Sequence, residues 1–398
     1  MLRENPAFRQ LWFARSVSYI GDILATVALV LHIEATEGSG VAVGILLLAQ
    51  TVPTLLGPFA GTLADRVDQR KLMVTCDIGQ ACVFGLIAVT VPSFPVLIGL
   101  VAVAAVLATM FRPAGTSVVP SLVREHELLS ANAWLGTSLN VGVALGPLLG
   151  GVLFALGGVE VALAFDAVTF LLSATFLLGL PALRASEEGT IHETGFFATT
   201  REGLSFARHH AVTRAVVLTL FLGVAFASVD NVALVFLARD ELGAGSVGYG
   251  IAVSAFGIGM TLISMALVRW SPPIATTTLF VAAFLATGLG NLLTGLAPVL
   301  ALVVVAQVFA GGGNGVENIA DNTLLQKTVP KPMLGRAFGL SSSAAWLGSG
   351  IAYAAGGVLV ELTSPRFAFV LSGAGVLGVA LLAYAMLRKG SEEPAVAA

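Results

Sequence analysis

The stretch Gly61-Thr-Leu-Ala-Asp-Arg-Val-Asp-Gln-Arg-Lys71 is a short charged segment between two long apolar runs. These runs lie near residues 41–63 and 72–91. Each has about the 20 residues that a helix needs to cross the roughly 30 Å hydrocarbon core of a bilayer. A charged turn between two such runs is typical of a helical hairpin that crosses a membrane twice. The same pattern continues in both directions along the chain.

Twelve apolar runs of this kind cover most of the 398 residues. They lie near 11–33, 41–63, 72–91, 96–118, 133–155, 161–180, 215–237, 249–268, 274–296, 299–323, 338–360 and 367–387. Only 11% of the residues are charged, whereas a typical soluble domain has about 25%. The mean hydropathy is +0.93. We therefore predict an all-α, polytopic membrane protein with twelve transmembrane helices.

The chain contains an internal repeat with an offset of 206 residues. The related segments are Gly142 with Gly348, Gly150-Gly151-Val152-Leu153 with Gly356-Gly357-Val358-Leu359, and Gly44-Ile45 with Gly250-Ile251. One offset that relates two separate helix pairs indicates a duplicated six-helix unit. Two parallel halves of this kind, related by an axis along the membrane normal, occur among transporters.

This repeat divides the chain into three parts. We predict an N-terminal six-helix half at 1–181, a cytoplasmic linker at 182–213 and a C-terminal six-helix half at 214–398. The linker is the only long polar stretch, and its second part has the pattern of an amphipathic helix on the membrane surface.

The distribution of basic residues predicts the orientation. With the N-terminus inside, 16 of the 20 Lys and Arg residues fall at the termini, in the linker or in cytoplasmic loops, and only Arg239 and Arg366 fall in outer loops. This asymmetry favours an inner (plasma) membrane protein with both termini in the cytoplasm. It also places Gly157–Glu160 in an outer loop.

The charged segment 61–71 resembles the G-x-L-a-D-r-x-G-r-k loop of the major facilitator superfamily. The resemblance implies that Gly61 allows close helix contact and that Asp65 caps a helix in the other half. It also implies that Arg66 and Arg70 complete a charge cluster that holds the inner gate shut. A carboxylate at a helix N-terminus contributes about 0.3–1 kcal/mol. Asp68 replaces the usual glycine, and Gln69 stands where arginine is frequent.

A second motif lies in the fifth span, Gly142-Val-Ala-Leu-Gly-Pro-Leu-Leu-Gly-Gly151. It resembles the G-x-x-x-G-P-x-x-G-G motif of antiporters in the same superfamily, which implies export. Gly142 and Gly146 are spaced for tight helix contact, and Pro147 predicts a bend.

Three further segments, at 5–9, 201–208 and 326–336, resemble the branch that holds macrolide efflux pumps and the enterobactin exporter. The arginine motif that the superfamily carries in its fourth span is not evident. Arg112 follows that position and is succeeded by Pro113, so the role of the family arginine is not carried over to it.

Five charged residues within spans are candidates for proton coupling or substrate binding. They are Asp22, Arg112, Asp230, Glu317 and Asp321. A charge exposed to lipid costs several kcal/mol, so these side chains are expected to face a cavity or a partner. The resemblance implies that spans one, four, seven and ten line that cavity. The alternative is a structural ion pair between a carboxylate and Arg15 or Arg112. Asp77 and Asp166 lie near span ends, where solvated or helix-end roles are alternatives to coupling.

Other classes of function are disfavoured by the sequence. The segment Gly311-Gly-Gly-Asn-Gly lacks the Lys-Ser/Thr pair of a phosphate loop. We find no clustered nucleophile and base and no metal-ligand set, so neither an enzyme nor a cofactor site is expected. The net charge of −3 gives no reason to expect nucleic acid as a partner.

The sequence thus predicts a monomeric secondary transporter, surrounded by membrane lipid, that exports drugs or small amphiphilic metabolites by alternating access in exchange for protons. The alternatives are an importer or lipid transporter of the same fold, and a transporter-like sensor that moves nothing.

Overall fold

A computed structural model describes residues 5–181, 205, 208, 210–269, 274–330 and 333–390. Within these ranges it does not describe the side chains of Pro58, Thr62, Asp65, His126, Leu129, Val268 and Lys389. The predicted linker and its amphipathic helix fall mostly outside the described residues.

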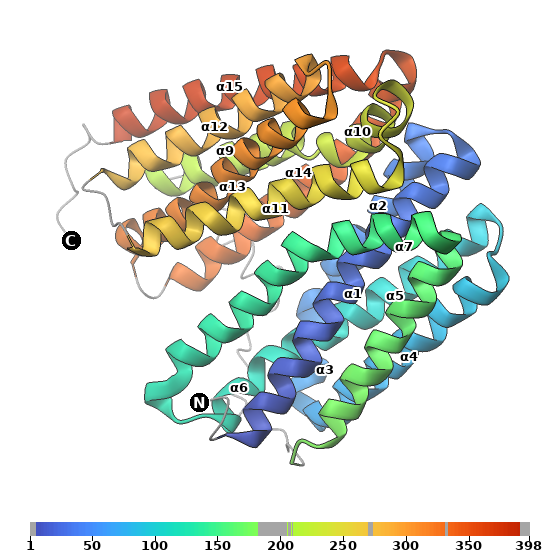
Figure 1. Cartoon of the computed structure of the whole chain (residues 1–398). Coiled ribbons are helices and arrows are strands. Elements are labelled where there is room, and N and C mark those ends of the chain that lie inside the picture. The colour runs from blue at the N-terminus through green and yellow to red at the C-terminus, as the bar shows by residue number, and fades with distance from the viewer. Residues whose placement is uncertain are drawn as a thin grey trace. The chain divides into compact units, whose positions relative to one another are not determined.

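The regular elements of the described residues are all helices (Figure 1). In the first part of the chain they are α1 (Pro6–Glu37), α2 (Gly40–Thr51), η1 (Val52–Leu56), α3 (Gly57–Arg66), α4 (Gln69–Thr90), α5 (Phe94–Ser117), α6 (Val119–Leu122), η2 (Glu125–Glu127) and α7 (Leu128–Leu178). In the second part they are α9 (Ala211–Ala227), α10 (Asp230–Phe236), η3 (Leu237–Glu241), α11 (Gly245–Arg269), α12 (Thr276–Leu296), α13 (Leu300–Thr328), α14 (Leu334–Leu362) and α15 (Pro365–Gly390).

The predicted all-α fold with twelve spans is confirmed in the part of the chain that the structure describes. Ten helical segments are long and apolar enough to cross a bilayer. One of them, Ser130–Leu178, has 49 residues, which is about 74 Å of helix and more than twice the roughly 30 Å thickness of the hydrocarbon core. It contains two spans, because the backbone leaves helical geometry at Gly157 and Gly158. The twelfth span is the interrupted helix Gly40–Leu56 with its continuation in α3.

The second and seventh spans are both broken, for reasons visible in their sequences. Pro53 lies at the start of η1, where a missing backbone N–H and a fixed φ interrupt regular hydrogen bonding. In the seventh span, α9 ends at Ala227, and Asp230 occupies the first turn of α10. An acidic side chain at that position interacts favourably with the helix dipole.

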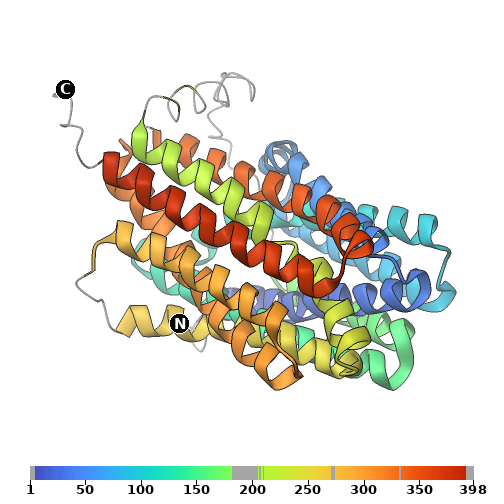
Figure 2. The same ribbon diagram turned by 90° about the horizontal axis from the view of Figure 1, so that it is seen from above.

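The chain forms two compact units. The first consists of residues 1–38, 45–191 and 245–254, and the second of 39–44, 192–244 and 255–398. In the first unit α7 packs along α1 and α4. Its core includes Phe8, Leu11 and Met73, all fully buried. In the second unit α15 lies along α9 and α12 in both ribbon views (Figures 1 and 2). Its core includes Phe280 and Phe284.

Short helix segments pack tightly against their own unit through glycines. A Cβ added to Gly250 of α11 would lie 2.6 Å from the carbonyl oxygen of Pro147 in α7, within the first unit. In the second unit, a Cβ added to Gly44 of α2 would overlap the carbonyl oxygen of Tyr353 in α14. The 206-residue offset maps Gly44 onto Gly250 and Pro147 onto Tyr353. The sequence repeat therefore also relates the contacts.

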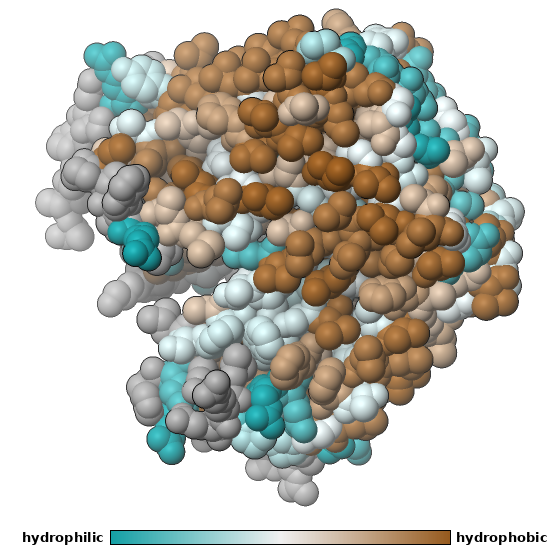
Figure 3. All heavy atoms as spheres, viewed as in Figure 1, coloured by the Kyte–Doolittle hydropathy of each residue, from teal (hydrophilic) through white to brown (hydrophobic). Residues whose placement is uncertain are grey.

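Large apolar side chains are exposed along the helices. Val89, Leu156 and Leu362 are 86%, 75% and 79% exposed. In the face shown in Figure 3, hydrophobic residues cover the flanks of the helices, whereas hydrophilic residues gather toward their ends. Such exposure is unfavourable in water and suits contact with lipid.

Candidate functional site

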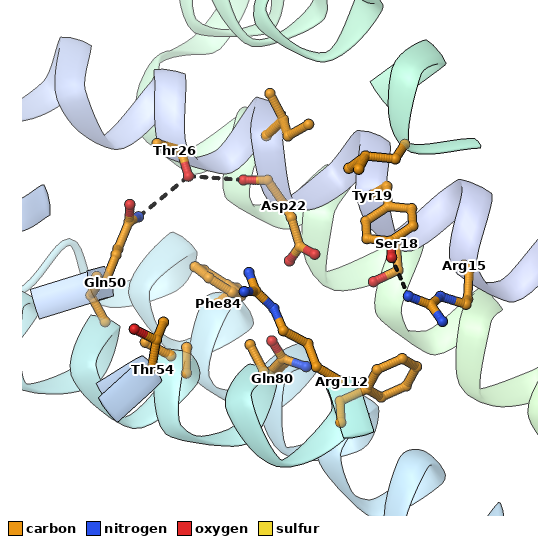
Figure 4. A pocket seen from close by; sticks show the side chains of 17 residues that line it. Arg15, Ser18, Tyr19, Asp22, Thr26, Gln50, Thr54, Gln80, Phe84 and Arg112 are labelled. Atoms are coloured by element: carbon orange, nitrogen blue, oxygen red, sulfur yellow. Dashed lines mark hydrogen bonds between the residues drawn. The ribbon is translucent and has the colours of Figure 1, made fainter. Parts of the chain in front are cut away.

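The first unit contains a cavity of about 250 Å³ between α1, α2, η1, α4 and α5. Its polar lining is drawn in Figure 4: Arg15, Ser18, Tyr19, Asp22, Thr26, Gln50, Thr54, Gln80 and Arg112. The remaining lining residues are mostly apolar. A mainly apolar cavity with a few converging polar groups is the usual character of a small-molecule site.

Asp22 and Arg112 are the oppositely charged pair of this cavity. Asp22 lies near the middle of α1 and is half-buried, and Arg112 lies near the end of α5 with a solvent-accessible side chain. Their charged groups point toward each other (Figure 4) and attract electrostatically. Two of the five predicted site residues are therefore brought together within one cavity.

Arg15, the other cation of the cavity, makes hydrogen bonds to groups other than Asp22. Its Nη1 donates to the carbonyl oxygen of Gly115 at 3.0 Å, and its Nη2 donates to the hydroxyl of Tyr19. Its guanidinium carbon also lies 5.2 Å from the centre of the Tyr19 ring. Of the two arginines considered as partners of Asp22, the structure favours Arg112.

The second unit contains a separate cavity of about 230 Å³, bounded by α9, α13 and α14. It holds Glu317 and Asp321, one turn apart on α13, together with Asn314, Asn318 and Asn322. Ser341 and Ser342 of α14 complete its polar wall. Among the described residues that line it there is no Lys or Arg.

Most polar groups of this second cavity can accept hydrogen bonds. The amide nitrogen of Asn318 is used within α13, where it donates to the backbone oxygen of Asn314 at 2.9 Å and to its side-chain oxygen at 3.1 Å. Oδ1 of Asp321 and the hydroxyl of Ser341 are buried without a hydrogen-bond partner among the described residues. The cavity is therefore suited to a ligand that donates hydrogen bonds.

Asp230 is not among the residues that line these two cavities. Its Oδ1 accepts a hydrogen bond from Nδ2 of Asn231 at 2.9 Å, and the side chain is half-buried at the start of α10. Tyr353 of α14 is near enough to interact with it electrostatically. Its predicted part in coupling remains a prediction.

The charged loop is only partly described. The side chain of Asp65 lies outside the described residues, and Arg66 is exposed at the end of α3. Arg70 donates to the carbonyl oxygen of Leu178. A Cβ at Gly61 would meet no described atom within 4 Å. The gating roles of these residues stay predictions.

The two departures from the loop pattern have local explanations. The side chain of Asp68 caps α4 by accepting from the backbone N–H of Lys71 at 3.1 Å. Gln69 is buried and donates from Nε2 to the hydroxyl of Ser117 on α5 at 3.0 Å. Both residues hold the beginning of α4 in place.

The glycines of the fifth span pack against α1, as the sequence predicts. An added Cβ would lie 3.1 Å from the backbone oxygen of Tyr19 at Gly142, and 2.9 Å from Cβ of Ile23 at Gly146. Close helix contact through these glycines is thus confirmed. The gating role predicted for Gly142, Gly146 and Pro147 is a separate matter and stays a prediction.

Sequence reasoning misplaced Asp77 and Asp166. Instead of being solvated at span ends, they are buried inside the first unit, with 1% and 0% of their surface exposed. Asp166 shares the buried face of α7 with Thr169 and Ser173. The spacing of these three residues, three and then four positions apart within an apolar run, is the signal that could have revealed them.

A family model described as transmembrane secretion effector matches residues 2–397. The chain is 28% identical over 397 residues to YfiS of Bacillus subtilis (strain 168), a transporter of the major facilitator type whose function is uncharacterised. That match covers 95% of this chain and 94% of YfiS. The chain is 27% identical to the enterobactin exporter EntS of Escherichia coli O127:H6, over 96% of this chain and 92% of EntS.

Solved structures of transporters share the fold. A variant of the nucleoside transporter NupG matches with a TM-score of 0.80 and 13% identity, over 96% of this chain and 99% of that chain. A bacterial homologue of the human lysosomal transporter Spinster matches with a TM-score of 0.74 and 15% identity, over 98% of both chains. The chain belongs to the transmembrane secretion effector family of the major facilitator superfamily.

Proposed function

We propose that this protein exports small amphiphilic compounds, drugs or secreted metabolites, in exchange for protons by alternating access. The observation that carries the proposal is the pair of Asp22 and Arg112 facing each other in the cavity of the first unit (Figure 4). A carboxyl group beside a cation has two useful states: ionised and paired with the cation, or protonated and released from it.

The pair gives a physical link between proton and substrate. The ionised carboxylate of Asp22 and the guanidinium of Arg112 attract each other electrostatically. The ionised carboxylate of Asp22 can accept hydrogen bonds from a substrate, whereas the protonated carboxyl has lost its charge. Protonation of Asp22 therefore weakens the binding of a substrate that donates hydrogen bonds to it, so proton and substrate compete for the same carboxylate. Such competition is what an antiporter requires.

Export, and not uptake, is supported by two independent findings. EntS exports enterobactin, and its sequence aligns with nearly the whole chain. The glycine-rich motif of the fifth span resembles that of antiporters. One proton moving inward across about 100 mV supplies about 2.3 kcal/mol, which can drive export against a gradient.

We further propose that the protein acts as a monomer in the inner membrane with both termini in the cytoplasm. Contacts within the first unit support this orientation. The start of α1 lies beside α6, where Nδ2 of Asn5 donates to the carbonyl oxygen of Leu122 at 2.6 Å, and Arg70 contacts the end of α7. One end of the unit therefore gathers Arg9, Arg70 and Arg124, as the positive-inside rule expects of a cytoplasmic face.

This orientation can be checked with single cysteines in a background without Cys76 and Cys82. Glu160 is a better position than Gly158, because Gly158 has a φ of +70° that strains any side chain. An impermeant thiol reagent should label Glu160→Cys from outside intact cells. Labelling only in inverted vesicles would reverse the orientation.

The function is tested by expressing the chain in cells that lack their own drug pumps. Their susceptibility to a panel of dyes, antibiotics and siderophores is measured together with accumulation, with and without an uncoupler. We expect lower accumulation of at least one compound, and the uncoupler should abolish the difference. Higher accumulation would indicate import, and no difference for any compound would favour a sensor.

A further inference from the structure

Behind the cavity of the first unit lies a second group of ionisable side chains. Asp77 of α4 and Asp166 of α7 do not line the cavity, although both interact electrostatically with Asp22, which does. The carboxyl of Asp166 and the hydroxyl of Thr169 lie against the backbone of Gly21, where an added Cβ would overlap both. Gly21 directly precedes Asp22, so the cavity and the buried group share one segment of α1.

The polar groups around Asp77 have unused hydrogen-bonding capacity. The hydroxyl of Ser173 faces the Asp77 carboxyl. Neither oxygen of Asp77, nor this hydroxyl, nor Oδ2 of Asp166 has a hydrogen bond of normal geometry among the described residues. Ser173 has no exposed surface. A buried, unpaired carboxylate is strongly unfavourable, whereas a protonated carboxyl is neutral and can donate a hydrogen bond.

The charge balance points the same way. The charged or titratable groups that face this pair are Asp22 of α1, Arg112 of α5, beside Asp22, and Cys76 of α4. Among the described residues around this cavity, three ionised aspartates would have at most two cations to balance them: Arg112, and Arg15, whose guanidinium donates to Gly115 and Tyr19. In the described part of the chain, no three His, Cys, Asp or Glu side chains form a group that could hold a metal ion. A proton is a ligand that two neighbouring carboxyl groups can hold without any further protein group.

We propose that Asp77 and Asp166 form a proton-binding pair, which holds a proton at neutral pH and exchanges it with the cavity through Asp22. In each exchange one O–H bond of the pair breaks and one forms on a carboxylate oxygen of Asp22, so no other reactant is needed. The stacked rings of Phe84 and Phe170, 5.8 Å apart, lie between the same two helices and help to exclude water. The use of this proton in transport rests on the proposed function, but its binding does not.

Infrared difference spectroscopy of the full chain in lipid vesicles tests the pair without any substrate. The signal is the carbonyl stretch of protonated carboxylic acids, followed from about pH 5 to about pH 9, a range in which an ordinary aspartate is ionised. We expect a protonated band at neutral pH that loses a resolvable part of its amplitude in Asp77→Asn and in Asp166→Asn. Asp240→Asn, an exposed aspartate, is the matched control and should leave the band unchanged.

Proton transfer through Asp22 is tested by the rate of hydrogen–deuterium exchange of the carboxyl groups of Asp77 and Asp166. In Asp22→Asn the band of the pair should persist, but its exchange with heavy water should be several-fold slower than in the wild type. Ser173→Ala, the variant least disruptive to folding, should shift the frequency of the same band. Replacing potassium by sodium should change nothing.

Four results would overturn the proposal: no protonated band at neutral pH, a band that neither aspartate substitution alters, loss of the band in sodium, or unchanged exchange in Asp22→Asn. None of these measurements depends on transport. Failure of the export assay would therefore leave the proton-binding pair standing.

Discussion

The cavities of the two units use carboxylates in different ways. In the first unit, Asp22 faces the guanidinium of Arg112, and Arg15 lies nearby (Figure 4). In the second, Glu317 and Asp321 are surrounded by amides and hydroxyls, with no basic residue among the described lining. Two repeats of one six-helix unit have therefore acquired opposite charge balances. We propose a division of labour, in which the carboxylate of Asp22 exchanges the proton and the acidic cavity of the second unit binds hydrogen-bond donors.

The largest effect is expected from removing the paired carboxylate. Asp22→Asn should reduce uphill, uncoupler-sensitive export by ten-fold or more, because residue 22 can then no longer bind and release a proton. A ten-fold change corresponds to about 1.4 kcal/mol of free energy. Downhill exchange of substrate should persist. Glu317→Gln is the corresponding substitution in the cavity of the second unit. It should weaken the affinity for substrate but leave export coupled to the proton gradient. Equal loss of coupling in both variants would remove the distinction between the cavities.

A smaller effect is expected from changing the cation of the pair. Arg112→Gln leaves Asp22 without its partner, so export should fall several-fold and its pH optimum should move. Arg112→Lys should restore most of the export rate, because it keeps the positive charge. The restoration should be incomplete, because lysine lacks the planar geometry of the guanidinium. Transport in vesicles at a series of external pH values measures both. A wild-type pH profile in Arg112→Gln would show that the pair is merely structural.

The smallest effects on transport are expected at glycines that the repeat relates, because substitutions there act on packing and stability. A Cβ at Gly150 would lie 2.7 Å from the backbone oxygen of Leu24, whereas its counterpart Gly356 has only an ordinary contact at 3.4 Å. Gly150→Ala should therefore destabilise the protein by about 1–3 kcal/mol. Gly356→Ala should be neutral or slightly stabilising, because alanine is the better helix former.

Gly142 and Gly348 are also related by the repeat, and here the substitution in the second unit should be the more destabilising one. The corresponding distances are 2.6 Å at Gly348 and 3.1 Å at Gly142, each to a backbone oxygen. Gly348→Ala should thus be the more harmful of the two. Apparent melting temperatures of the purified variants in detergent decide both comparisons. Equal melting temperatures within each pair would show that the helices separate to admit the methyl group.

Sequence reasoning found the cavity residues with uneven success. Asp22 and Arg112 were identified because a charge within an apolar span is conspicuous, but their pairing was one of several possibilities. Asp77 and Asp166 are also charged residues within apolar runs, but they were placed near span ends and were not included among the cavity residues. The error arose because position along a span was used as a measure of burial. In a helical bundle, burial depends on which face of the helix meets its neighbours.

The sequence by itself determined what depends on local composition and periodicity. Runs of about 20 apolar residues require helices that cross the membrane, since no other spanning structure satisfies the backbone hydrogen bonds of a single segment. The glycine repeat likewise showed the duplication and the close helix contacts. Only the tertiary structure decided which side chains meet. The rotation of each helix about its axis is fixed by packing against distant segments, such as Gly21 of α1 against Asp166 and Thr169 of α7. That rotation separates the carboxylate that faces the cavity from the two that lie behind it.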